Sequence, residues 1–394
     1  MPDIETLNAV AAADIASVNA VAKANIATVN GVGIPASGQT ATRWVASHDG
    51  DGTKFYISYA PHSDRTDWTG TIVQSATPDT YWLAYGKDGS GNPIWATANN
   101  SGSMEIARDD NNDVTDGSTW VSEGRAKKCR TLAWGNNIWV GIGHMSSDEK
   151  ILTRSADADT WANIDLSGIP NIQNTVTVFG LATDGVGNWM FGQGPRIFAS
   201  TDDAATWAEM DSYNAGTGGP VLDVGFTNNT WVVLDAGNPG QINTVGAAAF
   251  ATEMGGGSDA TWGAQEADDN VNTIETSDSG SKRATIACGN GVVIISNTRH
   301  TMAFDVNGAT ISVRASGRVG VGHNDTIGGH INTIATDGNG VWLVGSNGSS
   351  DPVTGGDVAE SLDNGATWTQ VLDDFSFNGD RKFEAIRANV FLPV

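Results

Sequence analysis

The chain has 394 residues, with 45 acidic and 21 basic side chains, and its formal net charge is −24. This balance excludes an electrostatic nucleic-acid binder and a protein that docks on anionic lipid, because both need a basic surface. Glycine contributes 49 residues, which indicates many turns, and the charged fraction of 17% argues against disorder driven by charge.

Cys129 and Cys288 are too few for a disulfide framework or a cysteine-rich zinc module, so we expect two buried, reduced thiols. No apolar run approaches the roughly 20 residues of a membrane span. The first residues also lack the basic start and apolar block of a signal peptide. We therefore predict no membrane insertion.

Residues 1–34 repeat an aliphatic pattern with a period of 11. If the segment is helical, the apolar positions form one nearly straight stripe. The stripe consists of Ile4, Leu7, Val10, Ile15, Val18, Val21, Ile26, Val29 and Val32. Because a single helix of this kind is marginal in water, we predict that residues 1–35 anchor the chain or drive its oligomerisation. Packing onto its own domain and disorder are the alternatives.

This repeat resembles N-terminal Ile/Val-Asn-Gly-Val arrays in structural proteins of tailed phages. Residues 36–41, which begin Ala36-Ser37-Gly38, have the composition of a flexible linker. We therefore predict three parts: an anchor at 1–35, a linker at 36–41 and a domain at 42–394.

Within 42–394, a unit recurs that consists of an apolar stretch, a turn rich in Gly and Asn, and a second apolar stretch. Gly and Asn supply the positive φ of tight hairpins, and the flanking β-branched and aromatic residues favour strands. The copies start at Leu83, Leu132, Leu181, Val224, Ile286 and Ile334, and the stretch from Phe383 to Leu392 repeats the unit once more. Each copy predicts a β-hairpin.

A second motif, Ser-x-Asp-x-Gly-x-Thr-Trp, follows the hairpins. The complete copy contains Ser361, Asp363, Gly365, Thr367 and Trp368. Less regular copies contain Ser200, Asp202, Thr206 and Trp207, and Ser155, Asp157 and Trp161, and remnants end at Trp68, Trp120 and Trp262. The motif resembles the Asp-box (BNR repeat) of sialidase-type β-propellers. In that family it is a structural turn between the third and fourth strands of a blade and does not mark the active site.

Successive tryptophans that end these motifs lie 41 to 55 residues apart. The exception is the interval between Trp262 and Trp368, which is about twice as long. One blade without its tryptophan, near Thr310-Ile311-Ser312, fills that gap. The predicted fold class is therefore all-β, a seven-bladed β-propeller with a short N-terminal α-helical stem. We expect one or two C-terminal strands to complete the first blade and close the ring.

The resemblance to sialidases does not extend to their catalytic residues. The early Arg-Ile-Pro signature is missing, and the nearest string, Pro195-Arg196-Ile197-Phe198, lies in the fourth predicted blade. We therefore predict no catalytic residue. A carbohydrate-active propeller, either a lectin or a glycoside hydrolase, is the alternative. A third candidate resembles the photosystem II assembly factor, although its export signal and basic patch are missing.

Three tryptophans outside the box, Trp44, Trp82 and Trp95, are expected in the core, with a sugar-binding face as their alternative role. The run Asp109–Asp113 resembles the start of a calcium loop, but Val114 replaces its glycine. The histidines do not have the spacing of zinc ligands. We predict no metal and no cofactor.

Together these features predict a non-enzymatic virion protein on the capsid or tail surface of a phage. The N-terminal helix would bind other virion proteins or further copies of the chain, with a trimer as one candidate oligomer. The propeller would attach to a host-surface glycan or decorate the particle. No nucleic-acid partner is predicted.

Overall fold

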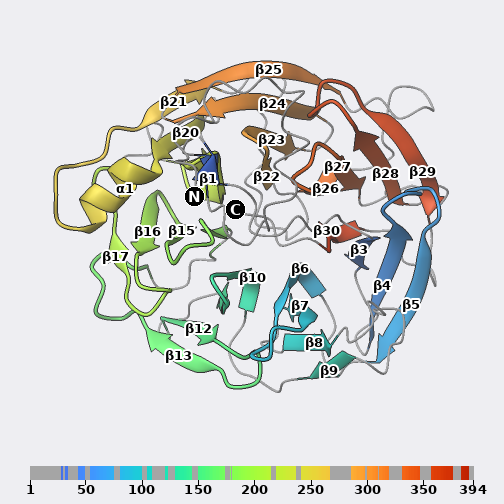
Figure 1. Ribbon diagram of the computed structural model, residues 1–394, viewed down its shortest axis with the longest axis horizontal. Coiled ribbons are helices and arrows are strands. Elements are labelled where there is room, and N and C mark those ends of the chain that lie inside the picture. Colours follow the sequence, from blue (N-terminus) through green and yellow to red (C-terminus); the bar gives the residue numbers. More distant parts are fainter. Residues whose placement is uncertain are drawn as a thin grey trace, which may run out of the picture.

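The computed structural model describes residues 28–29, 32–33, 43–48, 54–74, 80–99, 104–108, 120–122, 129–143, 150–173, 178, 180–213, 219–236, 241–266, 285–297, 300–308, 310–318, 331–346, 356–375 and 383–389. Within these residues, the strands form seven four-stranded antiparallel sheets and one two-stranded hairpin. The sheets surround one axis as the blades of a propeller (Figure 1). The predicted all-β, seven-bladed architecture is therefore confirmed.

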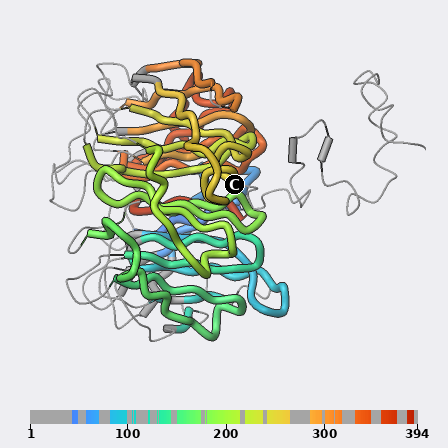
Figure 2. The backbone as a smooth tube through the Cα atoms, turned by 90° about the vertical axis from the view of Figure 1, so that its left-hand side faces the viewer, coloured from blue at the N-terminus to red at the C-terminus, as the bar shows by residue number. Residues whose placement is uncertain are grey.

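The innermost strand of each blade lies next to the axis, and these strands are neighbours around a closed ring. In ring order they are β30 (Phe383–Ala388), β6 (Thr80–Lys87), β10 (Cys129–Gly135), β14 (Leu181–Thr183), β18 (Val221–Thr227), β22 (Thr285–Gly289) and β26 (Ile331–Thr336). Seen from the edge, the described strands run across the thickness of the disc (Figure 2).

The other three strands of each blade follow outward in meander order. Blade 1 contains β3 (Arg43–His48), β4 (Lys54–Pro61) and β5 (Thr69–Gln74), and blade 2 contains β7 (Pro93–Asn99), β8 (Met104–Arg108) and β9 (Trp120–Ser122). Blade 3 contains β11 (Ile138–Gly143), β12 (Ile151–Ser155) and β13 (Ala162–Asp165). Blade 4 contains β15 (Trp189–Gln193), β16 (Arg196–Ser200) and β17 (Ala208–Glu209). Blade 5 contains β19 (Thr230–Asp235), β20 (Gln241–Gly246) and β21 (Gly263–Glu266). Blade 6 contains β23 (Val292–Asn297), β24 (His300–Asn307) and β25 (Thr310–Arg318). Blade 7 contains β27 (Trp342–Ser346), β28 (Gly356–Ser361) and β29 (Thr369–Phe375).

Blade 1 closes the ring with strands from both ends of the propeller. Its order is β30-β3-β4-β5, so one C-terminal strand is paired with three strands from the start of the domain. The side-chain oxygen of Asn389 accepts a hydrogen bond from the backbone N–H of Arg43 (3.0 Å). The backbone N–H of Asn389 donates to the carbonyl oxygen of Arg43 (3.2 Å). The question of one or two closing strands is thereby answered in favour of one.

The hairpin repeat accounts for the inner half of each blade. In the turns after β10 and β18, Asn136, Asn137, Asn228 and Asn229 have φ between 48° and 60°, the left-handed conformation that tight hairpins require. A tryptophan recurs in the second strand, opposite the inner strand, and is completely buried. The set is Trp44, Trp95, Trp139, Trp189, Trp231 and Trp342. Trp44 and Trp95 are therefore core residues.

The hydrophobic core lies between neighbouring blades. One buried cluster joins Ile138 and Val140 of blade 3 to Trp189 and Phe198 of blade 4, and another joins blades 1 and 7. The blade without its tryptophan is the sheet that ends in β25, where Ile311 packs against the cluster between blades 5 and 6. Burial between blades ties each sheet to both neighbours, which explains why closure matters to the whole ring.

The helix content differs from the prediction. The described residues contain one α-helix, α1 (Ala247–Met254), which lies between the third and fourth strands of blade 5. Its Phe250 is completely buried and packs against Trp231, with 4.9 Å between ring centroids. The helix formed by this alanine-rich run was not predicted. No helix within the described part of the chain is long and apolar enough to span a membrane.

Part of the predicted N-terminal helix is wrong. β1 (Thr28–Val29) and β2 (Val32–Gly33) form a short antiparallel hairpin in which Val29 is opposite Val32. The sequence between them is Asn-Gly, which is the strongest short signal for a hairpin turn. The rest of the segment 1–35 lies outside the described residues, and the boundaries 1–35, 36–41 and 42–394 stay a prediction.

Candidate functional site: the axial channel

The inner strands place one equivalent residue of each blade around the axis. This residue directly follows the first aliphatic residue of each hairpin repeat, as Ala133 follows Leu132. In six blades its side chain is small. The small residues are Ala84, Ala133, Ala182, Gly225, Ala287 and Ala335. In blade 1 the same position is Arg387, within Ile386-Arg387-Ala388. One long basic side chain therefore enters a channel that is otherwise lined by short ones.

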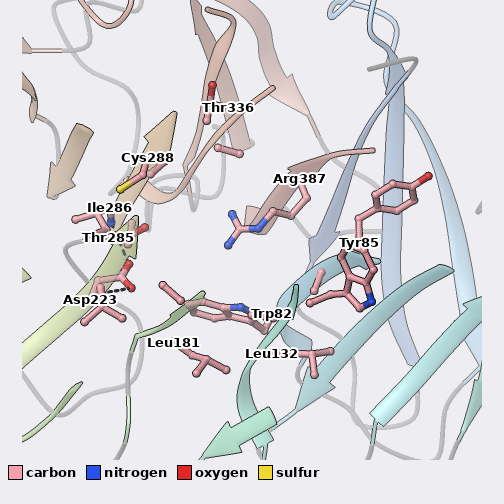
Figure 3. A pocket seen from close by; sticks show the side chains of 18 of the residues that line it. Trp82, Tyr85, Leu132, Leu181, Asp223, Thr285, Ile286, Cys288, Thr336 and Arg387 are labelled. Atoms are coloured by element: carbon pink, nitrogen blue, oxygen red, sulfur yellow. Dashed lines mark hydrogen bonds between the residues drawn. The ribbon is translucent and has the colours of Figure 1, made fainter. Parts of the chain in front are cut away.

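These residues surround a cavity of about 170 Å³ on the axis (Figure 3). All seven inner strands contribute to its lining, and aliphatic and aromatic side chains form most of the wall. Gly225 is the one glycine in the ring of small residues, and a Cβ there would lie 2.4 Å from the sulfur of Cys288 in the next blade. Close approach of the strands thus fixes this glycine.

Arg387 extends from β30 toward the middle of the cavity (Figure 3). Its Nη1 donates hydrogen bonds to the carbonyl oxygens of Ile386 (3.1 Å) and Ile334 (3.4 Å). Its guanidinium carbon lies 5.9 Å from the ring centroid of Trp82. Burial lowers the pKa of Arg387 and the charge of Asp223 raises it, and arginine remains protonated in proteins. The cavity therefore contains a positive charge.

Asp223 provides the negative charge of the same cavity. It is buried and follows an irregularity at the start of β18. Its Oδ1 accepts the N–H of Val224 (2.9 Å), and its Oδ2 accepts the N–H of Ile286 in blade 6 (3.0 Å). Thr333 makes an equivalent link between blades 7 and 1, because its Oγ1 accepts the backbone N–H of Ile386 (3.0 Å). The carboxylate of Asp223 therefore has a structural role as well as a charge.

The cavity is suited to binding more than to covalent catalysis. Burial raises the pKa of the Cys288 thiol, and the charge of Asp223 raises it further, so the sulfur is a protonated thiol and a poor nucleophile. Burial also raises the pKa of Cys129. Within the described residues, no group of three His, Cys, Asp or Glu side chains could hold a metal ion. A guanidinium and a carboxylate in one small cavity provide charged hydrogen-bonding groups for a polar ligand.

The predicted anchoring residues lie far from this channel in the sequence and are mostly undescribed. Val29 and Val32 lie in β1 and β2, and the other seven of the stripe lie outside the described residues, as does the run Asp109–Asp113. The anchoring role of the stripe stays a prediction.

The Ser-x-Asp motifs form tight turns between the third and fourth strands of their blades. In blade 4, Ser200 donates to Asp202 (2.8 Å), and Asp202 accepts the N–H (2.8 Å) and hydroxyl (2.6 Å) of Thr206. The ring N–H of Trp207 donates to the carbonyl of Ala204 (3.1 Å). Blade 7 repeats the carboxylate contacts with Ser361, Asp363 and Thr367, and blade 3 uses Ser155, Asp157, Thr160 and Trp161. These residues lie at blade turns and do not line the channel.

The turn position that the motif gives to glycine is left-handed in all three copies. Gly365 has φ +83°, and Ala158 and Ala204 adopt φ 63° and 62°. A Cβ at Gly365 would lie 2.5 Å from Ile294 in the neighbouring blade. Trp368 is half-buried and contacts the cluster between blades 6 and 7.

Sequence reasoning found neither Arg387 nor Asp223. Trp82, which we expected in the core, is half-buried and lines the channel, and Cys288, expected to be buried, lines it too. A usable signal was present for the arginine: aligned hairpin repeats show one Arg where the other copies have Ala or Gly. Asp223 gave a weaker signal, because its equivalents are Thr131, Thr285 and Thr333 as well as larger and smaller residues.

Comparisons with known proteins do not assign this chain to a family. No family model matches the chain, and no curated protein matches it. Among solved structures, the chain is similar to one described as the crystal structure of the WD40 β-propeller domain of Doa1. The identity is 13%, the TM-score is 0.49, and the match covers 78% of this chain and 90% of that one.

Proposed function

We propose that the chain is a non-enzymatic structural protein of a phage virion, in which the N-terminal segment anchors the protein and the propeller is displayed. The observation that supports this role is ring closure by β30 and β3. Within the described residues, every strand of the seven blades comes from residues 43–389, and β1 and β2 pair only with each other. This leaves a partner-binding role for the apolar stripe as our proposal.

The character of the propeller is consistent with display. The Ser-Asp turns have the contacts of a structural turn, which supports the proposed Asp-box kinship, and the net charge of −24 keeps a densely displayed protein soluble. Host-surface attachment through a glycan, or decoration of the particle, is the proposed use of the displayed face.

The anchoring role is tested by measuring the solution mass of the full chain and of a chain that starts at Thr40. The proposal predicts that the full chain self-associates or binds purified particles and that the shortened chain is a monomer that does neither. A double variant, Val18→Glu with Val21→Glu, should behave like the shortened chain because it places charges on the stripe. Ala16→Glu with Ala20→Glu adds the same charges off the stripe and should behave like the full chain. Equal masses and equal particle binding for all four proteins would refute the anchor.

The display role is tested separately with the chain that starts at Thr40. Binding to a host-surface polysaccharide on a glycan array would support attachment, and no binding would leave decoration. Release of reducing sugar from host envelope material would instead support the alternative, a glycoside hydrolase.

A further inference from the structure

Ring closure does not explain why Arg387 lies in the channel. Six of the seven blades close the same ring with Ala or Gly at this position. An arginine there loses part of its hydration, in agreement with the burial that lowers its pKa. A charged side chain that closure does not need, and that is costly to place in the channel, indicates a binding role.

The guanidinium of Arg387 has donors that the described residues do not use. Its two hydrogen bonds both come from Nη1 and end on the backbone carbonyl oxygens of Ile386 and Ile334. Among the described residues, no carboxylate lies within ion-pair distance of it, and Nε and Nη2 are accessible from the cavity. Because Nε–H and Nη2–H form a planar fork, they match the two oxygens of a carboxylate.

The surroundings of Arg387 hold this fork in place before any ligand binds. The guanidinium carbon lies 5.9 Å from the ring centroid of Trp82, within the range of a cation–π contact. Together with the two hydrogen bonds of Nη1, this contact restricts the rotation of the side chain. A side chain that is already ordered loses little conformational entropy when a ligand binds.

Asp223 restricts the charge of the ligand. It lies in blade 5, across the axis from blade 1 (Figure 3). Its oxygens accept the backbone N–H groups of Val224 and Ile286, so we assign it a place in the wall and no contact with the ligand. Its charge repels negative charge in the cavity, and more strongly when the ligand has two such charges. The cavity therefore favours a monoanion over a dianion.

The wall and the volume indicate the rest of the ligand. Ala84, Ala182, Leu132 and Leu181 line the cavity and suit a short hydrocarbon tail. An apolar cavity of about 150 Å³ holds benzene, which has about six heavy atoms, and this cavity measures about 170 Å³. Propionate and butyrate are of this size.

We propose that the axial channel binds a short aliphatic monocarboxylate. Its two oxygens accept the Nε–H and Nη2–H of Arg387, and its hydrocarbon tail lies against the alanine and leucine side chains of the wall. The ring of small residues leaves room for the ligand beside the one arginine. The site is independent of the N-terminal anchor, so either proposal can fail without the other.

Titration calorimetry of the full chain in a carboxylate-free buffer tests this proposal. Propionate should bind with a Kd on the order of 1 mM. Propionamide lacks the charge, and succinate and inorganic phosphate add negative charge, so each should bind about tenfold more weakly. Absence of propionate binding up to roughly 10 mM would overturn the proposal. Any of the other three probes binding as tightly as propionate would also overturn it.

The length of the tail provides a second comparison. Acetate has one methylene fewer than propionate and should bind about fourfold more weakly, because less apolar surface is buried against the wall. Chloride, which has no tail and cannot occupy both donors of the fork in the same way, should bind more weakly than acetate. Acetate or chloride binding as tightly as propionate would contradict the contact between tail and wall.

Three variants place the ligand. Arg387→Ala restores the residue type of the other blades and should weaken propionate binding by about 10- to 100-fold. Arg387→Lys keeps the charge without the planar fork and should weaken it by about tenfold. Ala133→Leu keeps Arg387 but narrows the cavity, which Ala133 lines, and should weaken binding by at least about tenfold. Wild-type affinity in Arg387→Ala or Ala133→Leu would overturn the placement, and wild-type affinity in Arg387→Lys would overturn the fork.

Arg314→Ala is the matched control. Arg314 lies on the outer strand of blade 6, where it pairs with Asp305, so this change removes one positive charge far from the channel. It should leave propionate binding unchanged, and a loss equal to that of Arg387→Ala would show a general charge effect and overturn the site. Thermal melting of each variant shows whether the ring is still folded.

Discussion

Blade 1 and blade 4 have the same strand order, but the chain assembles them differently. Blade 4 is continuous from β14 to β17, whereas blade 1 pairs β30 with β3 across more than three hundred residues of sequence. Blade 4 contacts blade 3 through an apolar cluster and through Asn136, whose amide donates to Asp203 (2.7 Å). Blade 1 adds polar contacts to blade 7: Arg65 forms an ion pair with Glu360, and the His62 ring is hydrogen-bonded to Asp337 (3.0 Å).

The two blades also differ in the turn between their third and fourth strands. Blade 4 has the complete Ser-Asp turn of Ser200 and Asp202. In blade 1, His62 stands where the serine would be, and Asp64 accepts the N–H (3.1 Å) and hydroxyl (2.6 Å) of Thr66. Pairing β30 with β3 closes a very long loop, which is entropically costly. The comparison teaches that polar contacts from blade 1 to blade 7 help to offset this cost.

The largest expected effect comes from Phe383→Ala in the closing strand. Phe383 is completely buried and packs edge-on against Trp68, with 5.5 Å between ring centroids. Removing its ring should reduce the free energy of unfolding by about 3–5 kcal/mol. The control is Phe198→Ala in blade 4, which is equally buried and packs on Phe191.

Urea unfolding measures the cost of both variants, and amide hydrogen exchange locates it. We expect exchange to rise in β3 to β5 of the Phe383 variant, since its strand closes the ring. Equal exchange in blade 1 of the two variants would show that closure is no weaker than a continuous blade.

Acid should weaken the turns of blade 4 and its relatives. Burial raises the pKa of Asp202, but hydrogen bonds from Thr206 and Ser200 outweigh it and hold the pKa below its ordinary 3.8. Asp363 behaves in the same way, and hydrogen bonding to Thr160 dominates at Asp157. Because these pKa values are lower in the folded state, their stabilisation is present above pH 3.8 and is lost as pH falls through the folded values.

Asp235 of blade 5 provides the internal contrast. Burial raises its pKa, so it is protonated in the folded state at a pH where the unfolded chain is not, and acidification favours its folded form. The free energy of unfolding of the wild type should fall as the pH is lowered from 6 to 2. In a triple variant with Asp157, Asp202 and Asp363 changed to Asn, this fall should be smaller. A parallel fall in the triple variant would contradict the assignment.

Removing one turn carboxylate should have a smaller effect. Asp202→Ala deletes the contacts to Ser200 and Thr206 and should cost about 1 kcal/mol, since the group is partly open to solvent. Asp64→Ala in blade 1 should cost less, because Asp64 is exposed and has no serine partner. Thermal melts of the two variants decide the order, and the reverse order would refute the ranking.

The smallest effect concerns the ion pairs. Arg65 and Glu360 join two blades and are 16% and 14% exposed, whereas Arg196 and Glu209 lie within blade 4, where the arginine is 39% exposed. Double-mutant cycles with Arg→Met and Glu→Gln should give about 1 kcal/mol or less for each pair, with the larger coupling between blades. Equal coupling at low and high salt would argue against an electrostatic contribution at either site.

Much of the fold was predictable from particular residues. The hairpin repeats at Leu132, Leu181 and Val224 indicated the inner strands, and the spacing of tryptophans located the blade at Thr310 that lacks one. Local patterns suffice for this because turn residues and alternating apolar residues act over a few positions. Helix α1 was missed because Ala247–Met254 has little amphipathic pattern, and its formation depends on Phe250 packing against Trp231.

The sequence by itself determined the repeating hairpins, the blade count and the residues that turn the chain, since each depends on neighbours within one blade. Only the tertiary structure decided that one C-terminal strand closes blade 1, that Asp64 makes its turn, and that Arg387 and Asp223 share a cavity. These features bring together residues that are far apart in the chain. Their positions depend on how the strands close around the axis, which no local pattern encodes.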